Sequence, residues 1–252
     1  MKIDVYTTIY NEDVILPYFL RHYESFAQRI FVFFDKSPDN SEKILRQHPK
    51  VTLFELKEHG INEGYWTSQI WTRYEEFSRG KADYVICVDA DEFVYHPHLI
   101  KVLEQEKKKG TLLIKPEGFI MFSETLPTTS GQIYEEIKDG IPDAWSCKSI
   151  IFDPEIYIRY RKGRHGAARA RLNGVGVSVE KNTGLKLLHY RYLGKEYFEK
   201  RDRRNFSRYY IGVTPPPYNM NLHHQLPDRT KGNRYEWAEK HKLEAVNVVD
   251  YG

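Results

Sequence analysis

The sequence has few of the features that mark a membrane protein, a disulfide scaffold or a zinc site. Cys87 and Cys147 are its only cysteines, and they form no Cys-x-x-Cys or zinc-like spacing. No segment approaches the roughly 20 consecutive apolar residues of a membrane-spanning helix, and the first residues lack the apolar stretch of a signal peptide. We therefore expect a reducing, cytoplasmic environment, and contact with the inner face of a membrane stays open.

A strong charge of either sign is also lacking. The formal net charge is +3, so no nucleic-acid partner is expected. The 252 residues, 40% hydrophobic and 29% charged, suffice for one large domain with a sizeable core. Tyrosine is abundant, with 19 residues, and aromatic rings can fill a core or form flat faces against sugars and bases.

Short apolar runs alternate with helical patterns over the first 115 residues. The pattern predicts strands at 3–8, 30–34, 51–55, 84–88 and 111–115, and helices at 14–26, 42–47, 62–79 and 97–109. Such alternation is typical of an α/β fold with a mostly parallel, Rossmann-like sheet flanked by helices. We expect residues 1–115 to form a nucleotide-binding half.

The alternation fades after residue 116, where aromatic and turn residues dominate. Strands are expected at 149–152 and 185–190, a charged helix at 195–210 and a helical segment around Trp237. Residues 116–252 are therefore predicted to form an irregular half that closes over the first one within a single domain.

Polar residues follow three of the predicted parallel strands, at the edge of an open sheet where ligands collect. Each residue can simply cap a turn, but their coincidence favours a ligand site. They are Thr8, Asn11 and Glu12 after the first strand, Asp35 after the second, and Asp89 and Asp91 after the fourth.

The segment Asp89-Ala90-Asp91 is the sharpest of these features. Mg²⁺ and Mn²⁺ prefer oxygen ligands, usually one or two carboxylates together with substrate phosphates. One aspartate can therefore bind the metal while the other reaches the metal or a ribose. Acidic pairs are common on protein surfaces, and the position after a buried strand is what favours a metal site here.

For two histidines and one basic segment, the sequence allows both a ligand-binding and a purely structural interpretation. His189 follows an apolar run and is either a ligand to a metal or phosphate or a core histidine bonded to backbone. His165 lies in a loop with glycines and cations, which suits an anionic or sugar ligand or a flexible basic loop. The cations of 195–208 form either a solvated helix face, the commoner case, or a contact with diphosphate or anionic lipid.

Several motifs together resemble the family-2-like glycosyltransferases of the GT-A fold. They are Tyr10-Asn11-Glu12, Asp89-Ala90-Asp91-Glu92-Phe93, a lysine-bearing strand at 148–152, Gly163-Arg164-His165, and His189-Tyr190 followed by an aromatic, lysine-rich helix. Together they span about residues 3 to 201. The branch usually has an Arg-Ser pair after His-Tyr, where this chain has Leu193-Gly194. The Gln-x-x-Arg-Trp of processive relatives is absent, which speaks against polymer extrusion.

The resemblance implies a role for each matching position. Thr8, Asn11 and Glu12 would line the nucleotide, and Asp35 would contact its base or ribose. Asp89 would approach the ribose or the metal, and Asp91 would ligate the metal. His189 would approach the metal or the diphosphate, and His165 would lie near the donor or acceptor and is our second catalytic candidate beside the base named below.

The predicted reaction moves a sugar from a nucleoside diphosphate, with UDP-sugars favoured, to a hydroxyl of a glycan or lipid-linked glycan, in surface polysaccharide or glycoconjugate synthesis. It needs Mn²⁺ or Mg²⁺ and, by family analogy, inverts the anomeric centre. An inverting enzyme needs a carboxylate base at the acceptor. Asp143 is our candidate because it lies on a turn beside Trp145, and the alternatives are Glu117, Glu124 and Asp153.

Three other functions compete with this one. A sugar nucleotidyltransferase would need a glycine-rich, basic loop after the first strand, and the segment Thr7–Glu12 has no Gly, Lys or Arg. A phosphohydrolase normally carries its Asp-x-Asp after the first strand rather than the fourth. A non-catalytic scaffold that binds carbohydrate or nucleotide would keep the fold without turnover, which only an assay can distinguish.

Overall fold

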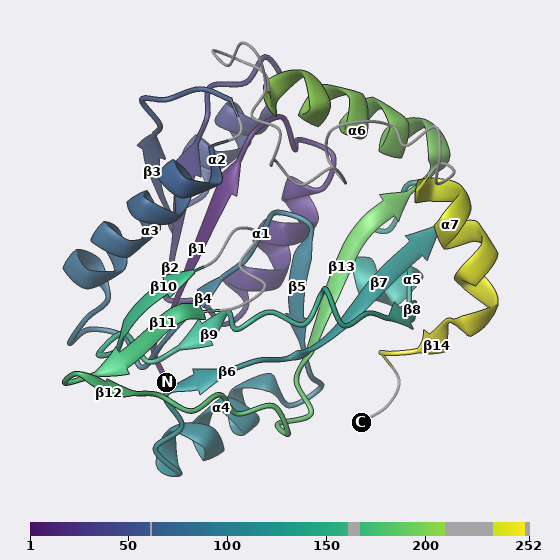
Figure 1. Ribbon diagram of the computed structural model, residues 1–252. Coiled ribbons are helices and arrows are strands. Elements are labelled where there is room, and N and C mark those ends of the chain that lie inside the picture. The colour runs from purple at the N-terminus through teal and green to yellow at the C-terminus, as the bar shows by residue number, and fades with distance from the viewer. Residues whose placement is uncertain (61, 161–166, 210–233, 250–252) are drawn as a thin grey trace.

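The computed structural model describes residues 1–60, 62–160, 167–209 and 234–249. These residues form a mixed α/β protein around two large sheets, with a smaller sheet of three strands at one side (Figure 1). No helix in the described ranges combines the length and apolar character that crossing a membrane requires.

The first sheet has six strands in the order β3-β2-β1-β4-β9-β6. Strands β1 (Ile3–Ile9), β2 (Arg29–Phe34), β3 (Val51–Glu55) and β4 (Tyr84–Cys87) are parallel. Strand β9 (Ile151–Phe152) runs antiparallel to both β4 and β6 (Leu113–Ile114). The predicted parallel α/β sheet is confirmed, and the carboxyl ends of its parallel strands lie along one edge.

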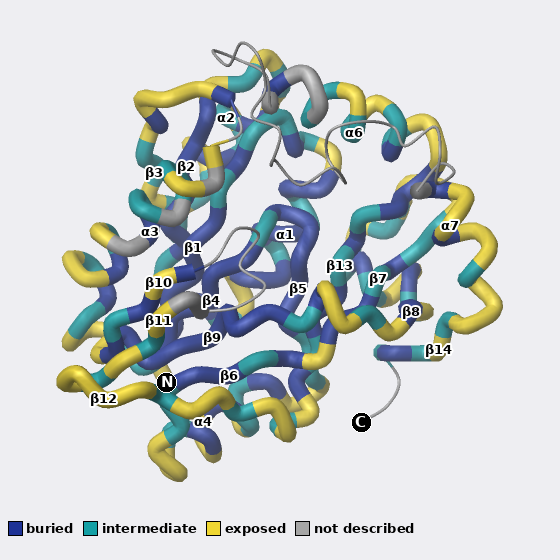
Figure 2. Tube along the Cα trace, viewed as in Figure 1, coloured by how far each residue is buried: buried dark blue, intermediate teal, exposed yellow. Residues whose placement is uncertain are grey.

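Both faces of this sheet are buried along β1, β2 and β4, which explains the apolar runs of these strands. Val5, Val32 and Ile86 pack on one side with α1 (Leu16–Glu24), α2 (Ser41–Gln47) and α4 (Leu99–Lys108). Tyr6 and Phe33 face the other side, with α3 (Glu63–Phe77) and the small sheet of β10 (Tyr157–Tyr160), β11 (Ala167–Leu172) and β12 (Val175–Gly176). In Figure 2 the central strands are accordingly dark blue.

The half expected to be irregular contains a second sheet, in the order β14-β8-β7-β13-β5. Its members are β5 (Glu92–Tyr95), β7 (Glu117–Ser123), β8 (Asp139–Pro142), β13 (Lys186–Leu193) and β14 (Val246–Asn247), with the short α5 (Ile133–Glu136) between β7 and β8. These strands pair across long stretches of sequence, so local periodicity does not reveal them. Since β5 joins this sheet and β9 joins the first, the halves 1–115 and 116–252 share both sheets.

Helix α6 (Lys195–Tyr209) begins where β13 ends and crosses the upper end of β1 (Figure 1). Gly194 has a φ of +71° and donates its N–H to the carbonyl of Ser123 at 2.8 Å. Its positive φ, which side chains disfavour, turns the chain from the strand into the helix. Phe198 of α6 packs on Tyr192 and on Tyr235 of α7 (Arg234–His241), and the short 3-10 helix η3 (Lys242–Glu244) then leads to β14.

Candidate active site

The loops that follow β1, β2 and β4 meet beneath α6. Glu12, Asp35 and Asp91 come from these three loops and are 7%, 2% and 4% exposed. Each of them accepts a hydrogen bond from an arginine of α6, from among Arg201, Arg204 and Arg208. The spacing 201, 204, 208 puts the three arginines on one face of the helix. The charged segment 195–208, for which a solvated helix face is the commoner expectation, therefore turns part of its surface toward the sheet.

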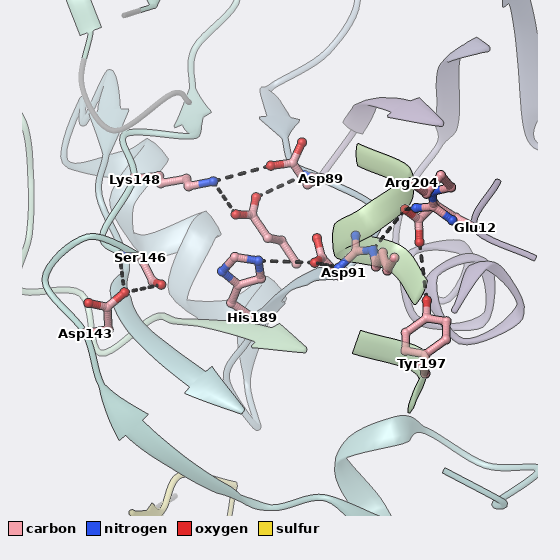
Figure 3. Close-up of polar contacts among 11 residues, drawn as sticks. Glu12, Asp89, Asp91, Asp143, Ser146, Lys148, His189, Tyr197 and Arg204 are labelled. Carbon is pink, nitrogen blue, oxygen red and sulfur yellow. Dashed lines mark hydrogen bonds and ion pairs between the residues drawn. The ribbon is translucent and has the colours of Figure 1, made fainter. Parts of the chain in front are cut away.

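Asp91 is held by an arginine of α6 and by a histidine of β13. Its Oδ2 lies 2.5 Å from Nη1 of Arg201 and 3.2 Å from Nε2 of His189 (Figure 3). Burial alone would raise the pKa of Asp91, but Arg201 and His189 outweigh it and hold that pKa well below its usual range. The pairing is buried rather than a surface contact, so Asp91 is ionised and enclosed.

His189 reaches Asp91 because β13 lies beside β5, the strand that begins directly after the aspartate turn. His189 is opposite Glu92 in that antiparallel pair, and the N–H of Tyr190 donates to the carbonyl of Asp91 at 2.8 Å. The two residues are 98 positions apart in sequence. The alternative of a core histidine bonded only to backbone does not describe this contact.

Glu12 joins the first loop to α6. Its Oε1 accepts from Nε of Arg201 at 3.1 Å and from Nη2 of Arg204 at 2.8 Å, and its Oε2 lies 3.5 Å from the hydroxyl of Tyr197. Burial raises the pKa of Tyr197, and the charge of Glu12 raises it further, so this hydroxyl is a neutral donor. Glu12 is therefore fixed by donors from α6.

Two further residues of the first loop are Thr8 and Asn11. Thr8 is half-buried on β1. Asn11 has a φ of +54°, a conformation that asparagine tolerates better than most residues, and its carbonyl accepts from Arg204. The loop thus contributes backbone as well as side chains to the site.

Asp35 lies at the next strand end. Its carboxylate accepts from Nδ1 of His59 at 2.6 Å, from the N–H of Gly60 at 3.2 Å and from Arg208. The guanidinium of Arg208 lies 3.4 Å from the centre of the Tyr10 ring. Burial lowers the pKa of Arg208, and Asp35 opposes that shift. The arrangement combines a flat aromatic face with a carboxylate acceptor.

Asp89 occupies a different environment from Asp91. Its side chain is 37% exposed and lies 3.4 Å from Nζ of Lys148, whose own side chain is 5% exposed. Lys148 also donates to the fully buried Glu92, and Glu92 accepts the N–H of Asp89 at 3.0 Å (Figure 3). The buried Lys148–Glu92 pair therefore fixes the start of the aspartate turn.

The donor set suits a metal that is shared with a phosphate group. Within the described ranges, no group of three or more His, Cys, Asp or Glu side chains could hold a metal by itself. Asp89, Asp91 and His189 nevertheless offer the carboxylate oxygens and imidazole nitrogen that Mn²⁺ accepts, and Mg²⁺ commonly takes one or two protein carboxylates plus substrate phosphates. By the chemistry of their donor atoms these residues suit a divalent cation whose remaining ligands come from a diphosphate.

Asp143 follows β8 and caps the turn that comes after this strand. Its Oδ1 accepts the N–H of Trp145 at 3.2 Å, and its Oδ2 accepts the N–H and the hydroxyl of Ser146 at 2.9 and 2.6 Å. Trp145 is 74% exposed. The same loop continues to Lys148, which connects it to the aspartate turn.

The other candidates for a base lie in less favourable places. Asp153 pairs with Lys107 at 2.6 Å, and Lys107 also donates to the carbonyl of Asp83, just before β4 begins. Asp153 thus lies at the opposite edge of the sheet from Asp91. Glu124 is 70% exposed and pairs with Lys242, and Glu117 is exposed at the start of β7. His165 lies outside the described residues.

Several site residues were not predicted as such. In the sequence Glu92 and Lys148 lie within motifs without a role of their own, and the three arginines lie within a charged run. A usable signal was the spacing of those arginines on one helical face. No signal in the sequence linked His59 to Asp35.

The sequence matches the family model described as Glycosyl transferase family 2 over residues 4–146, which is more than half of the chain. The chain belongs to glycosyl transferase family 2. The family match contains Glu12, Asp35, Asp89 and Asp91, and it ends before Lys148 and α6. The resemblance drawn from the motifs is confirmed at the level of the family.

This family-2 chain is also similar to solved structures, at low sequence identity. For TarS of S. aureus the identity is 14% and the TM-score 0.45, with 89% of this chain and 41% of TarS covered. For TarS 1–349 in complex with UDP-GlcNAc the identity is 13% and the TM-score 0.44, with 89% of this chain and 69% of the TarS chain covered. A third structure is the glucosyl-3-phosphoglycerate synthase of Mycobacterium tuberculosis in complex with Mn²⁺, UDP and phosphoglyceric acid. Its identity is 16% and its TM-score 0.36, with 46% of this chain and 43% of the synthase covered.

The match thus covers less than half of the first and third of these proteins. No curated protein matches the chain.

Proposed function

We propose that this protein transfers a sugar from a nucleoside diphosphate to an acceptor hydroxyl, with Mn²⁺ or Mg²⁺ as its cofactor. The observation that carries the proposal is the convergence of Glu12, Asp35 and Asp91 from three strand ends, with His189 brought to Asp91 from β13. In an open α/β sheet this edge is where ligands bind. Membership of glycosyl transferase family 2 agrees with it.

Asp89, Asp91 and His189 are the residues that would hold the metal. Once bound, the metal supplies Lewis-acid stabilisation of the charge that develops on the departing diphosphate. Asp91 is already ionised, because its pKa lies well below the usual range. Lys148 and Glu92 fix the turn from which Asp89 projects.

The nucleoside is assigned to the surroundings of Asp35. A base can stack on the ring of Tyr10 and donate an N–H to Asp35, the two contacts that Arg208 makes in this structure. We assign Thr8, Asn11 and Glu12 to the same nucleotide site. We take UDP-sugars as the first donors to test and assign the nucleoside of the donor to the half 1–115.

The acceptor is assigned to the half 116–252 and to Asp143 as the general base. As the acceptor oxygen attacks the anomeric carbon and the bond to the diphosphate breaks, Asp143 takes the proton of the acceptor hydroxyl. Attack from the side opposite the diphosphate inverts the anomeric centre. The exposed ring of Trp145 offers a flat face to the sugar of a glycan or lipid-linked glycan acceptor, as surface polysaccharide or glycoconjugate synthesis would require.

An assay of UDP release tests the proposal. The chain is incubated with a panel of UDP-sugars, Mn²⁺ and simple glycan acceptors, and then with EDTA. We expect metal-dependent release that Asp91→Asn lowers at least about 1,000-fold, since that variant removes charge from a metal ligand. Asp143→Asn should abolish transfer and leave donor binding unchanged.

Three results would contradict parts of this proposal. Full activity in EDTA would contradict the proposed role of the metal. Normal transfer by Asp143→Asn would contradict the proposed role of Asp143 as the general base. Binding of glycan without turnover of any nucleotide sugar would identify a non-catalytic scaffold.

A further inference from the structure

The arginines of α6 hold the carboxylates to which the proposed function assigns the metal and the nucleotide. Arg201 donates to Asp91 at 2.5 Å and to Glu12 at 3.1 Å. Arg204 donates to Glu12 at 2.8 Å and also to the carbonyl of Asn11. The arginine side chains are 14% and 17% exposed, and those of Asp91 and Glu12 are 5% and 9% exposed. All four charges are therefore largely withdrawn from water.

The charges within this group of four cancel. Withdrawing a charge from water is costly, and removing only one partner leaves an uncompensated charge behind. A divalent cation added to Asp91 alone would place two more positive charges beside Arg201. A cation that arrives with a diphosphate brings negative charge as well, so the arginines can leave the carboxylates and remain paired.

The chemistry of the two cation types favours the same exchange. Divalent metals prefer carboxylate oxygen, whereas a guanidinium presents several N–H donors in a plane that matches phosphate oxygens. Arg201 and Arg204 also lie on the helical face that looks toward the strand ends: Arg201 contacts the aspartate turn through Asp91, and Arg204 contacts the loop after β1 through Glu12. The carboxylates are thus placed to bind a divalent metal, and the arginines are placed to bind phosphate oxygens.

We propose that Arg201 and Arg204 bind the diphosphate of the donor, and that they exchange the carboxylates of Asp91 and Glu12 for it when metal and nucleotide bind together. This inference rests on the proposed function and names residues of the donor site in α6, a helix that the family match does not reach. The ligand is a nucleoside diphosphate, and the exchange involves ion pairs and hydrogen bonds only, so no covalent bond is formed or broken. Each ligand should then strengthen the binding of the other, because each takes a partner that the other would have to displace, and by the same factor, because coupling between two ligands is reciprocal.

The test compares three substitutions on one helix, Arg201→Met, Arg204→Met and Arg203→Met, by calorimetry. The titrants are Mn²⁺ alone, UDP with saturating Mn²⁺, and uridine. Arg203 is the matched control because its side chain is 74% exposed and pairs only loosely with Glu199, at 3.9 Å. Thermal melting checks that each variant is folded.

We expect opposite effects on the two ligands in Arg201→Met. UDP should bind about 10- to 100-fold more weakly, the loss of a charge-assisted hydrogen bond, while Mn²⁺ alone binds more tightly because Asp91 has lost a competing cation. Arg204→Met should weaken UDP by a similar factor and leave Mn²⁺ unchanged, since its contacts are with Glu12 and Asn11. Uridine binding should be unchanged throughout, and Arg203→Met should match the wild type.

Several outcomes would overturn the proposal. If UDP binds equally well or better without the arginines, they are only competitors for the carboxylates. If Arg201→Met weakens Mn²⁺, UDP and uridine alike, its role is structural. If Arg201→Met does not fold, Arg201→Lys replaces it, and normal UDP affinity with lysine would contradict the match between guanidinium and phosphate on which the proposal depends.

The outcomes also separate this inference from the proposed function. UDP binding that none of the substitutions changes would refute the inference and leave the function standing. A wild-type chain that binds no nucleoside diphosphate with Mn²⁺ would refute both.

Discussion

The two aspartates of one turn are held in different ways. Asp91 is buried, and its partners come from a helix and a strand about 100 positions later in the sequence. Asp89 is partly exposed, and it is fixed through Lys148 and Glu92. Glu92 begins β5 and is fully buried, so this second group is part of the framework of the sheets.

The difference separates a fixed side of the site from a side that can exchange partners. Lys148 and Glu92 pair with each other and are almost fully buried, so their loss should appear first in stability. Arg201 and Arg204 can transfer their contacts to a ligand, so their loss should appear first in binding. The three predictions below test whether the framework behaves as this comparison requires.

The largest effect is expected from Lys148→Met. This change leaves the carboxylate of Glu92 buried without its cation, and breaking a buried ion pair typically costs about 3–5 kcal/mol. Urea denaturation should show that loss, and the double variant Lys148→Met with Glu92→Gln should recover part of it. A loss below 1 kcal/mol would place Lys148 with the exchangeable residues instead.

The next effect is a pH dependence that arises in the core beneath the turn. Burial lowers the pKa of His22 to about 4, although its Nε2 contacts the carbonyl of Val94 at 3.0 Å. The unfolded chain, with a pKa near 6.5, binds the proton first as the pH falls. Stability should therefore be unaffected above pH 6.5 and decrease by about 3 kcal/mol between pH 6.5 and 4.

Urea denaturation of the wild type and of His22→Gln at pH 7, 5.5 and 4.5 measures this effect. The variant should lose less free energy than the wild type over that range. If the two decline in parallel, the acid sensitivity has its origin outside His22.

A smaller effect is expected from Gly118→Ala, which tests the support of the loop that bears Lys148. A Cβ on Gly118 would lie 2.3 Å from the backbone of Ser146 and 2.5 Å from that of Cys147. Such overpacking typically costs about 1–3 kcal/mol, and the displaced loop should also lower transfer activity. The control is Gly176→Ala, where no atom lies within 4 Å of an added Cβ; equal stability of the two variants would contradict the prediction.

Most elements of the first half could be predicted because their signals are local. The run Val51–Glu55 matches β3 residue for residue, and the helix expected at 62–79 is α3 at Glu63–Phe77. The acidic turn after β4 was recognisable since a strand buried on both faces is apolar throughout. Strand β5 was missed because it follows the turn at once, without a loop of its own.

The second half could be predicted only in part, because its strands find their partners at long range. Strand β13 was expected at 185–190, but nothing local shows that it lies between β5 and β7. The neighbourhood of His189 and Asp91 depends on that placement. Likewise, the sequence alone favours a solvated face for the cations of α6. Only the structure shows that three of them pair with Glu12, Asp35 and Asp91.

The amino-acid sequence alone determined the parallel α/β half, the family and the acidic residues at the strand ends, since periodicity, turn chemistry and short motifs are local properties. Only the tertiary structure decided which cations meet those acids. The ion pair of Arg201 with Asp91, 110 positions apart, depends on strand order and on where α6 crosses the sheet, and both follow from packing between segments that are distant in the sequence.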